Sequence, residues 1–161
     1  MISPQWLPQF LTFSDYGGLW QAYIDAVYAV FEYDFITSDC LFRGNRVGVR
    51  RQPSFENKWF TFWHCISEGE VEAQRMPDLR RCERIPWIRP VIENDSDSCV
   101  DVWTAKKKSD RRLYLWLSEQ YLIVLGIRKN HYLLITAFPT DQPHTIRKLR
   151  TERNSANNEK S

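Results

Sequence analysis

One stretch of the sequence holds residue types that can cleave a phosphodiester without a metal ion. His64 follows the aromatic pair Phe62-Trp63 and is soon followed by Ser67 and Glu68. An imidazole exchanges protons near neutral pH, which makes His64 a candidate general acid or base. We expect Ser67 and Glu68 to position His64 or to contact the phosphate. The alternative for His64 is a hydrogen-bonded core histidine beside Trp63.

Arginines follow within about the length of one helix. They are Arg80, Arg81 and Arg84, with Glu83 between the last two. A guanidinium group binds a phosphate through a planar fork of donors, so all three are candidate phosphate ligands. On a helix, Arg80 and Arg84 share a face, whereas Arg81 points elsewhere. The alternative is an exposed helix laced with salt bridges.

Two clusters of basic residues, 106–112 and 144–150, suit contact with a nucleic-acid backbone. The first contains Lys106, Lys107 and Arg112. Each cation placed on a phosphate makes binding depend on salt. Trp116 is a candidate for stacking on an unpaired base. The alternatives are a solvated turn and a frayed terminal helix for the clusters, and aromatic packing between a sheet and a helix for Trp116.

Composition excludes several classes of protein. The chain has 161 residues, a net charge of only +2, 43% hydrophobic and 14% aromatic residues, which indicates an ordered core and not a polycation or a disordered chain. It contains no Cys-x-x-Cys or His-Glu-x-x-His pattern and no glycine-rich nucleotide loop, so we expect no metal and no cofactor. No run approaches the roughly 20 apolar residues of a membrane span, and the first residues do not resemble a signal peptide. We therefore expect a cytoplasmic protein with reduced, buried cysteines and no membrane partner.

The first half of the chain predicts helices and short strands. Apolar residues recur every three or four positions over 14–35, which indicates a helix with one buried face. Residues 41–51 predict a bent strand, and alternation over 58–66 predicts a second strand with His64 near its end. Over 70–84 we expect two short helical pieces broken near Met76-Pro77, with Pro77 in a first helical position and Asp78 at the helix start.

The last third predicts an antiparallel meander. Its four strands are expected over 99–105, 112–117, 121–128 and 131–138. Thr136 shares one face of the last strand with Leu134 and Phe138. A short basic helix over 146–153 and a disordered tail over 154–161 complete the chain.

The expected fold class is therefore α+β. An N-terminal helix and short strands (1–57) precede a core (58–153) in which a helical segment packs on the four-stranded meander. We expect these parts to form one compact domain.

The order of elements over 58–153 resembles the BECR superfamily of ribonucleases, which includes barnase, EndoU, colicin-type and RelE-like enzymes. The matching segments are Phe62-Trp63-His64, Ser67-Glu68-Gly69, the helix from Arg80 to Ile85 and a last strand ending in Thr136-Ala137-Phe138-Pro139. More narrowly, the chain is similar to phage- and mobile-element-associated bacterial members. Residues 1–57 lie outside the resemblance.

The resemblance implies a metal-independent RNA endonuclease, toxin-like, that acts on tRNA or mRNA and is paired with an antitoxin or immunity protein. It also implies that the last strand, and with it Thr136, reaches the active cleft. Some members use a second histidine, for which His131 and His144 are the candidates. In such a site, the His64 ring and the arginines meet over the concave side of the meander.

Two other classes of function stay open. The same basic residues suit a nucleic-acid-binding module without catalysis. The aromatic N-terminal helix suits an interaction protein, such as an immunity or antitoxin partner.

Overall fold

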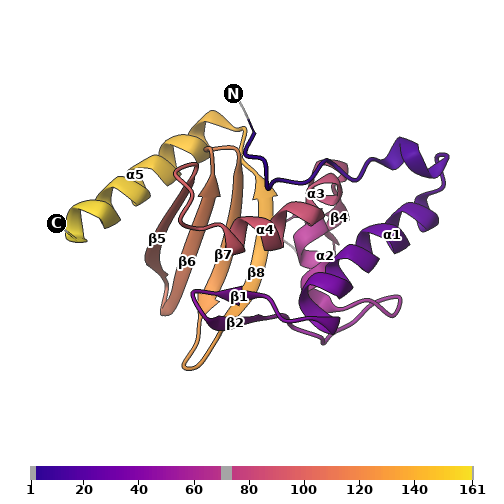
Figure 1. Cartoon of the computed structure of the whole chain (residues 1–161), viewed down its shortest axis with the longest axis horizontal. Helices are drawn as coiled ribbons and strands as arrows, with labels where there is room; N and C mark the ends of the chain where they lie inside the picture. The colour runs from indigo at the N-terminus through magenta and orange to yellow at the C-terminus, as the bar shows by residue number, and fades with distance from the viewer. Residues whose placement is uncertain (1–2, 70–73, 161) are drawn as a thin grey trace.

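A single six-stranded sheet organises the molecule, with helices on both of its faces (Figure 1). The computed structural model describes residues 3–69 and 74–160. The strands lie in the order β1-β2-β8-β7-β6-β5. The main hydrophobic core lies between one face of the sheet and three helices, and a smaller core lies under the C-terminal helix on the other face. These helices are α1 (Trp20–Glu32), α2 (Phe60–Ile66), α4 (Ile88–Glu93) and, at the C-terminus, α5 (Pro143–Lys160). The prediction of an α+β fold is confirmed.

The four C-terminal strands pair in sequence order and run antiparallel. They are β5 (Val100–Lys107), β6 (Asp110–Leu117), β7 (Tyr121–Ile127) and β8 (Tyr132–Pro139). Alternation along β6 sends Leu113 and Leu115 into the main core, and Tyr114 and Trp116 into the smaller one. The sheet is larger than the predicted meander because two N-terminal strands extend it.

These additional strands are β1 (Leu41–Phe42) and β2 (Asn45–Gly48), which form a tight antiparallel pair. β2 then pairs in parallel with β8, with Val47 opposite Tyr132. Phe42 is buried and meets the Tyr132 ring edge-on at 5.2 Å between ring centroids. Through β1 and β2, the N-terminal part of the chain therefore joins the same sheet as the C-terminal half.

The predicted helix over 14–35 is present in three pieces. A 3-10 turn (Phe13–Tyr16) precedes α1 (Trp20–Glu32), which continues into a π-helical turn (Tyr33–Thr37). Gly17 and Gly18 separate the first two pieces because both adopt positive φ, at 62° and 74°. The buried face of α1 comprises Tyr23, Ile24, Val27, Tyr28 and Phe31.

The predicted strand over 58–66 is wrong. Residues Phe60–Ile66 form the helix α2. Alternating aromatic residues favour a strand by propensity, but Phe62, Cys65 and Ile66 also stand at helical spacing and are all completely buried. Tertiary burial decides between the two periodicities. His64 therefore stands on a helix and not at the end of a strand.

The segment after α2 differs from its prediction in one respect. Ser67–Glu68 (β3) and Met76–Pro77 (β4) pair as a two-stranded sheet, so Pro77 lies in a strand and not in a helix. Asp78 caps α3 (Leu79–Glu83), since its carboxylate accepts from the Arg80 amide at 3.0 Å. Residues 70–73 of the predicted helical pieces lie outside the described residues. A 3-10 turn (Ile85–Trp87) and α4 (Ile88–Glu93) follow α3.

The predicted disordered tail over 154–161 is also wrong. One helix, α5 (Pro143–Lys160), continues through it, and only residue 161 lies outside the description. Polar composition predicted disorder, yet Leu149, Ile146 and Ala156 pack against the sheet along one side of α5. None of the described helices combines the length and the apolar composition that a membrane span needs.

Candidate functional site

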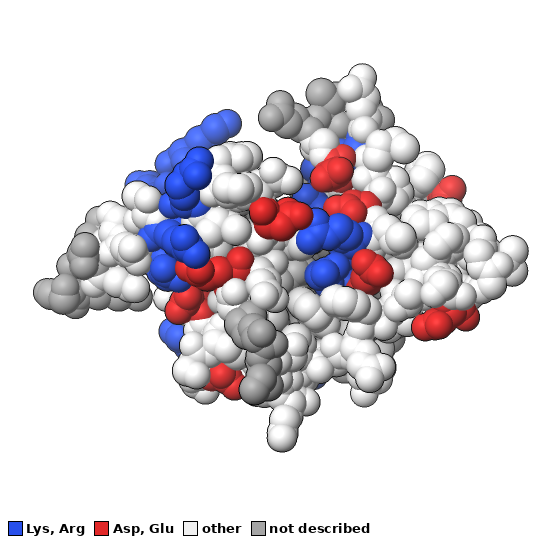
Figure 2. Space-filling model, turned by 90° about the horizontal axis from the view of Figure 1, so that it is seen from above, with Lys and Arg blue, Asp and Glu red and all other residues white. Residues whose placement is uncertain are grey.

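A groove crosses the α5 side of the sheet along β8. Two depressions of about 410 and 490 Å³ share Phe138 and Thr145 in their walls and therefore adjoin. We call them together the sheet groove. Its arginine end is lined by Glu68, Arg80 and Arg81, and its lysine end by Lys106, Lys107, Arg112 and Lys148. Seen from above, Lys and Arg side chains gather in two groups, one toward the C-terminal helix and one near the middle of the molecule (Figure 2).

Arg81 is the most firmly held cation of the arginine end. Its Nη1 donates to the Ser67 carbonyl at 2.7 Å, and its Cζ lies 5.2 Å from the centre of the Phe138 ring. The nearest carboxylate, Asp78, is 3.7 Å from its Nε. Burial, aided by the charge of Arg75, lowers the pKa of Arg81, but a guanidinium group stays protonated in a protein. The result is a charged group with a fixed direction.

Arg80 is held more loosely at the same end. Its Nη1 lies 2.6 Å from Oδ2 of Asp141, and both side chains are about half exposed, at 48% and 51%. Asp141 precedes α5 and lines the groove as well. An anion that enters the groove competes with this carboxylate for Arg80.

The lysine end carries more positive charge without an acidic partner, among the described residues, than the arginine end does. Arg112 is paired with Asp110 at 3.2 Å. Among the described residues, Lys106, Lys107 and Lys148 form no ion pair. Glu152 is the acid of this end, and its Oε1 accepts from the Trp103 indole at 3.4 Å. This end therefore suits a negatively charged ligand.

The floor of the groove is formed by side chains of β6, β7 and β8. Tyr114 stacks on Trp103 with 5.4 Å between ring centroids and 12° between planes, and burial raises the pKa of its phenol. Thr136 stands opposite Val124 and lines the groove. Its hydroxyl donates to the His64 carbonyl at 3.4 Å. The last strand thus places Thr136 at the groove and next to α2.

His64 contacts a residue of the groove wall through its backbone carbonyl. The carbonyl accepts from Thr136 and, at 3.1 Å, from Nη2 of Arg75. Its half-buried ring packs against Phe60, with 5.4 Å between ring centroids. The ring is absent from the described walls of the sheet groove. The expected meeting of this ring with the arginines is not the arrangement observed.

Arg84 lies apart from the groove, contrary to the helical spacing argument. Its Cζ is 4.4 Å from the Phe10 ring and 5.3 Å from the Trp87 ring. α3 ends at Glu83, and Arg84 has left helical geometry at φ −103° and ψ 5°. Arg81, expected to point elsewhere, lines the groove with Arg80 instead.

Two further candidate RNA-binding residues are buried and hydrogen-bonded within the protein. Trp116 is completely buried, and its indole donates to the Thr140 hydroxyl at 2.9 Å, so the prediction that it stacks on a base is wrong. Ser67 is buried and hydrogen-bonded to the Trp63 carbonyl, while its own carbonyl holds Arg81. Of the other histidines, neither His131 nor His144 lines the groove in the described part of the chain.

Sequence reasoning missed part of the groove wall. Thr145, Lys148 and Glu152 come from α5, which crosses the sheet. The basic cluster 144–150 signalled Lys148, but nothing in the sequence indicated where this helix docks. Asp141 carried no signal either.

The cysteines are poor candidates for chemistry. All four are free, and burial raises the pKa of Cys40, Cys65 and Cys82 to about 12. Within the described ranges, no three His, Cys, Asp or Glu side chains come close enough together to hold a metal ion. Comparisons with protein-family models, with curated proteins and with solved structures found no match to the chain.

Proposed function

We propose that the protein is a metal-independent RNA endonuclease whose substrate lies in the sheet groove. One observation carries the proposal: a fixed guanidinium group and an exposed carboxylate stand at one end of a groove, and lysines without acid partners stand at the other. RNA is a polyanion, and cleavage at its 2′-hydroxyl needs positive charge, a base and an acid.

In this mechanism, Arg81 and Arg80 bind the scissile phosphate and stabilise the charge of the phosphorane. Glu68 takes the proton of the 2′-hydroxyl, whose oxygen forms a bond to phosphorus. The bond from phosphorus to the 5′-oxygen breaks, and His64 supplies a proton to that oxygen once its ring turns away from Phe60. The products are a 2′,3′-cyclic phosphate and a free 5′-hydroxyl.

The fold supports the proposal. Helices precede an antiparallel run of four strands, and the last of these strands lies under the groove. The resemblance to BECR ribonucleases implies such a run of four strands, although here the sheet has six strands and His64 stands on α2. The proposal extends to a cytoplasmic toxin that acts on tRNA or mRNA, with an antitoxin or immunity protein that covers the positive groove.

The test is an assay with end-labelled tRNA and mRNA in the presence of EDTA. We expect cleavage that leaves 2′,3′-cyclic phosphate ends. Glu68→Gln and His64→Ala each lower the rate by about 10²–10⁴-fold, the range typical of a lost general acid or base. Glu56→Gln removes an exposed carboxylate that does not line the groove and serves as the matched control. Absence of cleavage by the wild-type protein contradicts the proposal.

A non-catalytic RNA-binding module is the second candidate. It is favoured by the contact of the His64 ring with Phe60, since no imidazole then lines the groove. The same assay separates the two functions, because this candidate predicts retention of intact RNA on the protein.

A further inference from the structure

A second cavity lies on the other side of the β3–β4 pair. It has a volume of about 500 Å³. We call it the aromatic slot, and its walls include Pro53, Phe55, Phe60, Trp63, Arg75 and Pro77. None of these residues takes part in the chemistry described above, apart from the contact of Phe60 with the His64 ring.

Phe55 is held rigidly although its ring is exposed. Its amide donates to the Lys58 carbonyl, and its carbonyl accepts from the Lys58 amide, both at 3.0 Å. The Trp63 indole donates to the same Phe55 carbonyl at 2.9 Å. Lys58 is itself buried and paired with Asp25 at 2.9 Å. Phe55 is nevertheless 63% exposed. An exposed apolar side chain on a fixed backbone loses less conformational entropy when a partner binds than one on a mobile loop.

The slot offers flat aromatic surfaces and few directional donors. Phe55 and Trp63 meet at 65° with 5.5 Å between ring centroids. Because the Trp63 N–H is bound to a backbone carbonyl, its indole has only its faces left to offer. Phe60 carries the guanidinium group of Arg50 at 4.6 Å. Such surfaces stack on a flat ring with little regard to its hydrogen-bonding pattern.

The charge around the slot is positive. Arg50, which contacts Phe60, and Arg75, which lines the slot, form no ion pair with any described residue. Arg75 donates instead to the carbonyls of Gly69 and His64, at 2.8 and 3.1 Å, and so contacts no carboxylate of the described residues. Flat surfaces surrounded by positive charge match the two parts of a nucleotide, the base and the phosphate.

The slot is also close to the sheet groove along the chain. Ser67 lines the slot and the next residue, Glu68, lines the groove, since adjacent residues of a strand point to opposite sides. We propose that the aromatic slot binds an unpaired base of the same RNA strand whose scissile phosphate lies in the sheet groove. This inference rests on the proposed function for the identity of its ligand.

Binding of a 12-nucleotide single-stranded DNA tests the slot apart from cleavage, because DNA lacks the 2′-hydroxyl. Fluorescence anisotropy of the labelled strand should show that Phe55→Ala weakens binding about tenfold, the effect typical of one lost stacking contact. Phe55→Trp should keep the affinity for the single strand. A fully paired duplex should bind the wild type and Phe55→Ala with equal affinity. Phe10→Ala is the matched control, since Phe10 is also exposed (45%) and lines neither the aromatic slot nor the sheet groove.

The outcomes separate this inference from the proposed function. If the wild type cleaves RNA but Phe55→Ala binds the single strand normally, the slot is overturned and the nuclease stands. If Phe55→Ala loses affinity while the wild type cleaves no RNA, the slot stands and the nuclease falls. Should Phe55→Ala fail to fold by circular dichroism, Phe55→Leu keeps the apolar volume without the aromatic face and should show the same loss.

Discussion

Arg81 and Arg84 carry the same side chain three positions apart, yet different contacts hold them. Arg81 is bound to the Ser67 carbonyl beside Phe138, whereas Arg84 lies on Phe10 and Trp87. Charge alone therefore does not make either residue a phosphate ligand. Position relative to the groove separates the two.

We expect Arg81→Ala to lower RNA cleavage by about 100-fold, the scale of removing one donor to transition-state charge. Arg84→Ala should leave cleavage unchanged, because Arg84 does not line the groove. Single-turnover rates with saturating enzyme measure the difference, and thermal melting checks that both variants fold. If Arg81→Ala and Arg84→Ala lost cleavage rate equally, the loss would come from lower stability of the folded protein and not from a missing phosphate contact.

Asp34 gives a prediction for pH. Burial raises the pKa of its carboxyl from 3.8 to about 6, and its side chain accepts no hydrogen bond from a described residue. Because the folded-state pKa is the higher one, the folded protein holds this proton more tightly. The stability that the protonated group contributes is present below pH 3.8 and is lost as the pH rises through about 6.

Asp34→Asn should therefore stabilise the protein at pH 7 by about 1 kcal/mol, a figure reduced for partial exposure. The gain should disappear below pH 3.8. Urea unfolding at the two pH values measures it, with the exposed Asp15→Asn as control. A gain that persists in acid would contradict the assignment.

At the scale of elements, ion pairs attach α5 to the sheet in addition to its apolar contacts. Glu119 lies 2.6 Å from Arg150 and 3.1 Å from Arg153, and Arg153 also lies 2.8 Å from Asp101. The hydrogen bond from Arg150 is the largest influence that lowers the pKa of Glu119. One carboxylate in the turn before β7 thus holds two arginines of α5.

Glu119→Gln should loosen α5 and leave the sheet intact. Hydrogen exchange at neutral pH should become faster at the amides of α5, while those of β6 and β7 keep their protection. Glu32→Gln, an exposed change on α1, is the control. Uniformly faster exchange would mean that the substitution lowers global stability instead.

Sequence patterns predicted some of these elements well and others badly, for physical reasons. The C-terminal strands follow from short apolar runs separated by turn residues, and the run over 121–127 is apolar on both faces because β7 is buried on both sides. Residues 60–66 satisfy both the strand and the helix periodicity, so only their burial against α1 and β8 decides for α2. The end of α5 is polar, and its docking depends on partners such as Glu119 that are distant in sequence. The groove could not be predicted in full for the same reason, since α5 supplies one of its walls.

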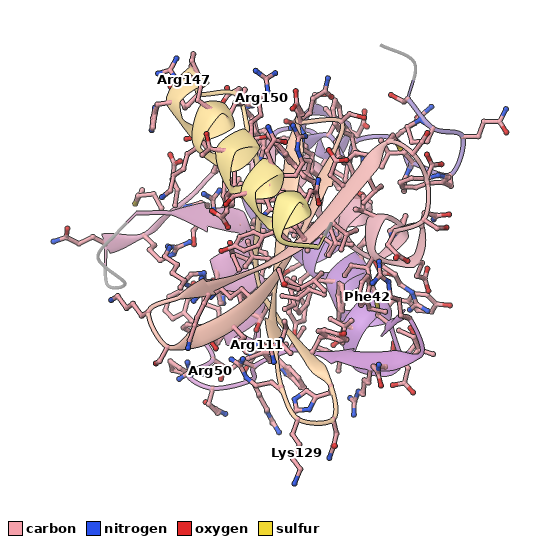
Figure 3. The ribbon with its side chains drawn as sticks, turned by 90° about the vertical axis from the view of Figure 1, so that its left-hand side faces the viewer. Phe42, Arg50, Arg111, Lys129, Arg147 and Arg150 are labelled. Carbon is pink, nitrogen blue, oxygen red and sulfur yellow. The ribbon has the colours of Figure 1, made fainter. Side chains whose placement is uncertain are left out.

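For the whole molecule, a net charge of +2 conceals an uneven distribution. Lys106, Lys107 and Lys148 gather at one end of the groove, where Glu152 is the acid. Figure 3 shows Arg147 and Arg150 on α5 and Lys129 in the turn between β7 and β8, away from α5. Lys129 is not among the described residues that line the groove, so RNA bound there should meet Lys106, Lys107 and Lys148 and not Lys129.

Salt dependence tests this arrangement. We expect Lys148→Gln to reduce the slope of log K against log salt for single-stranded RNA by about 0.7, the contribution of one lost phosphate contact. Lys129→Gln should leave the slope unchanged. Anisotropy titrations between low and moderate salt measure both, and an equal decrease would indicate a diffuse attraction to the whole surface.

The parallel pairing of β2 with β8 sets how far the chain can be shortened. β8 supplies Thr136 and Phe138 to the groove, and it is an interior strand only because β2 covers its outer side. A fragment that begins at residue 58 would leave the backbone amides and carbonyls of β8 open to another molecule. Such a fragment should self-associate through that strand, and size-exclusion chromatography would show it; the N-terminal segment therefore protects the strand that carries the groove residues.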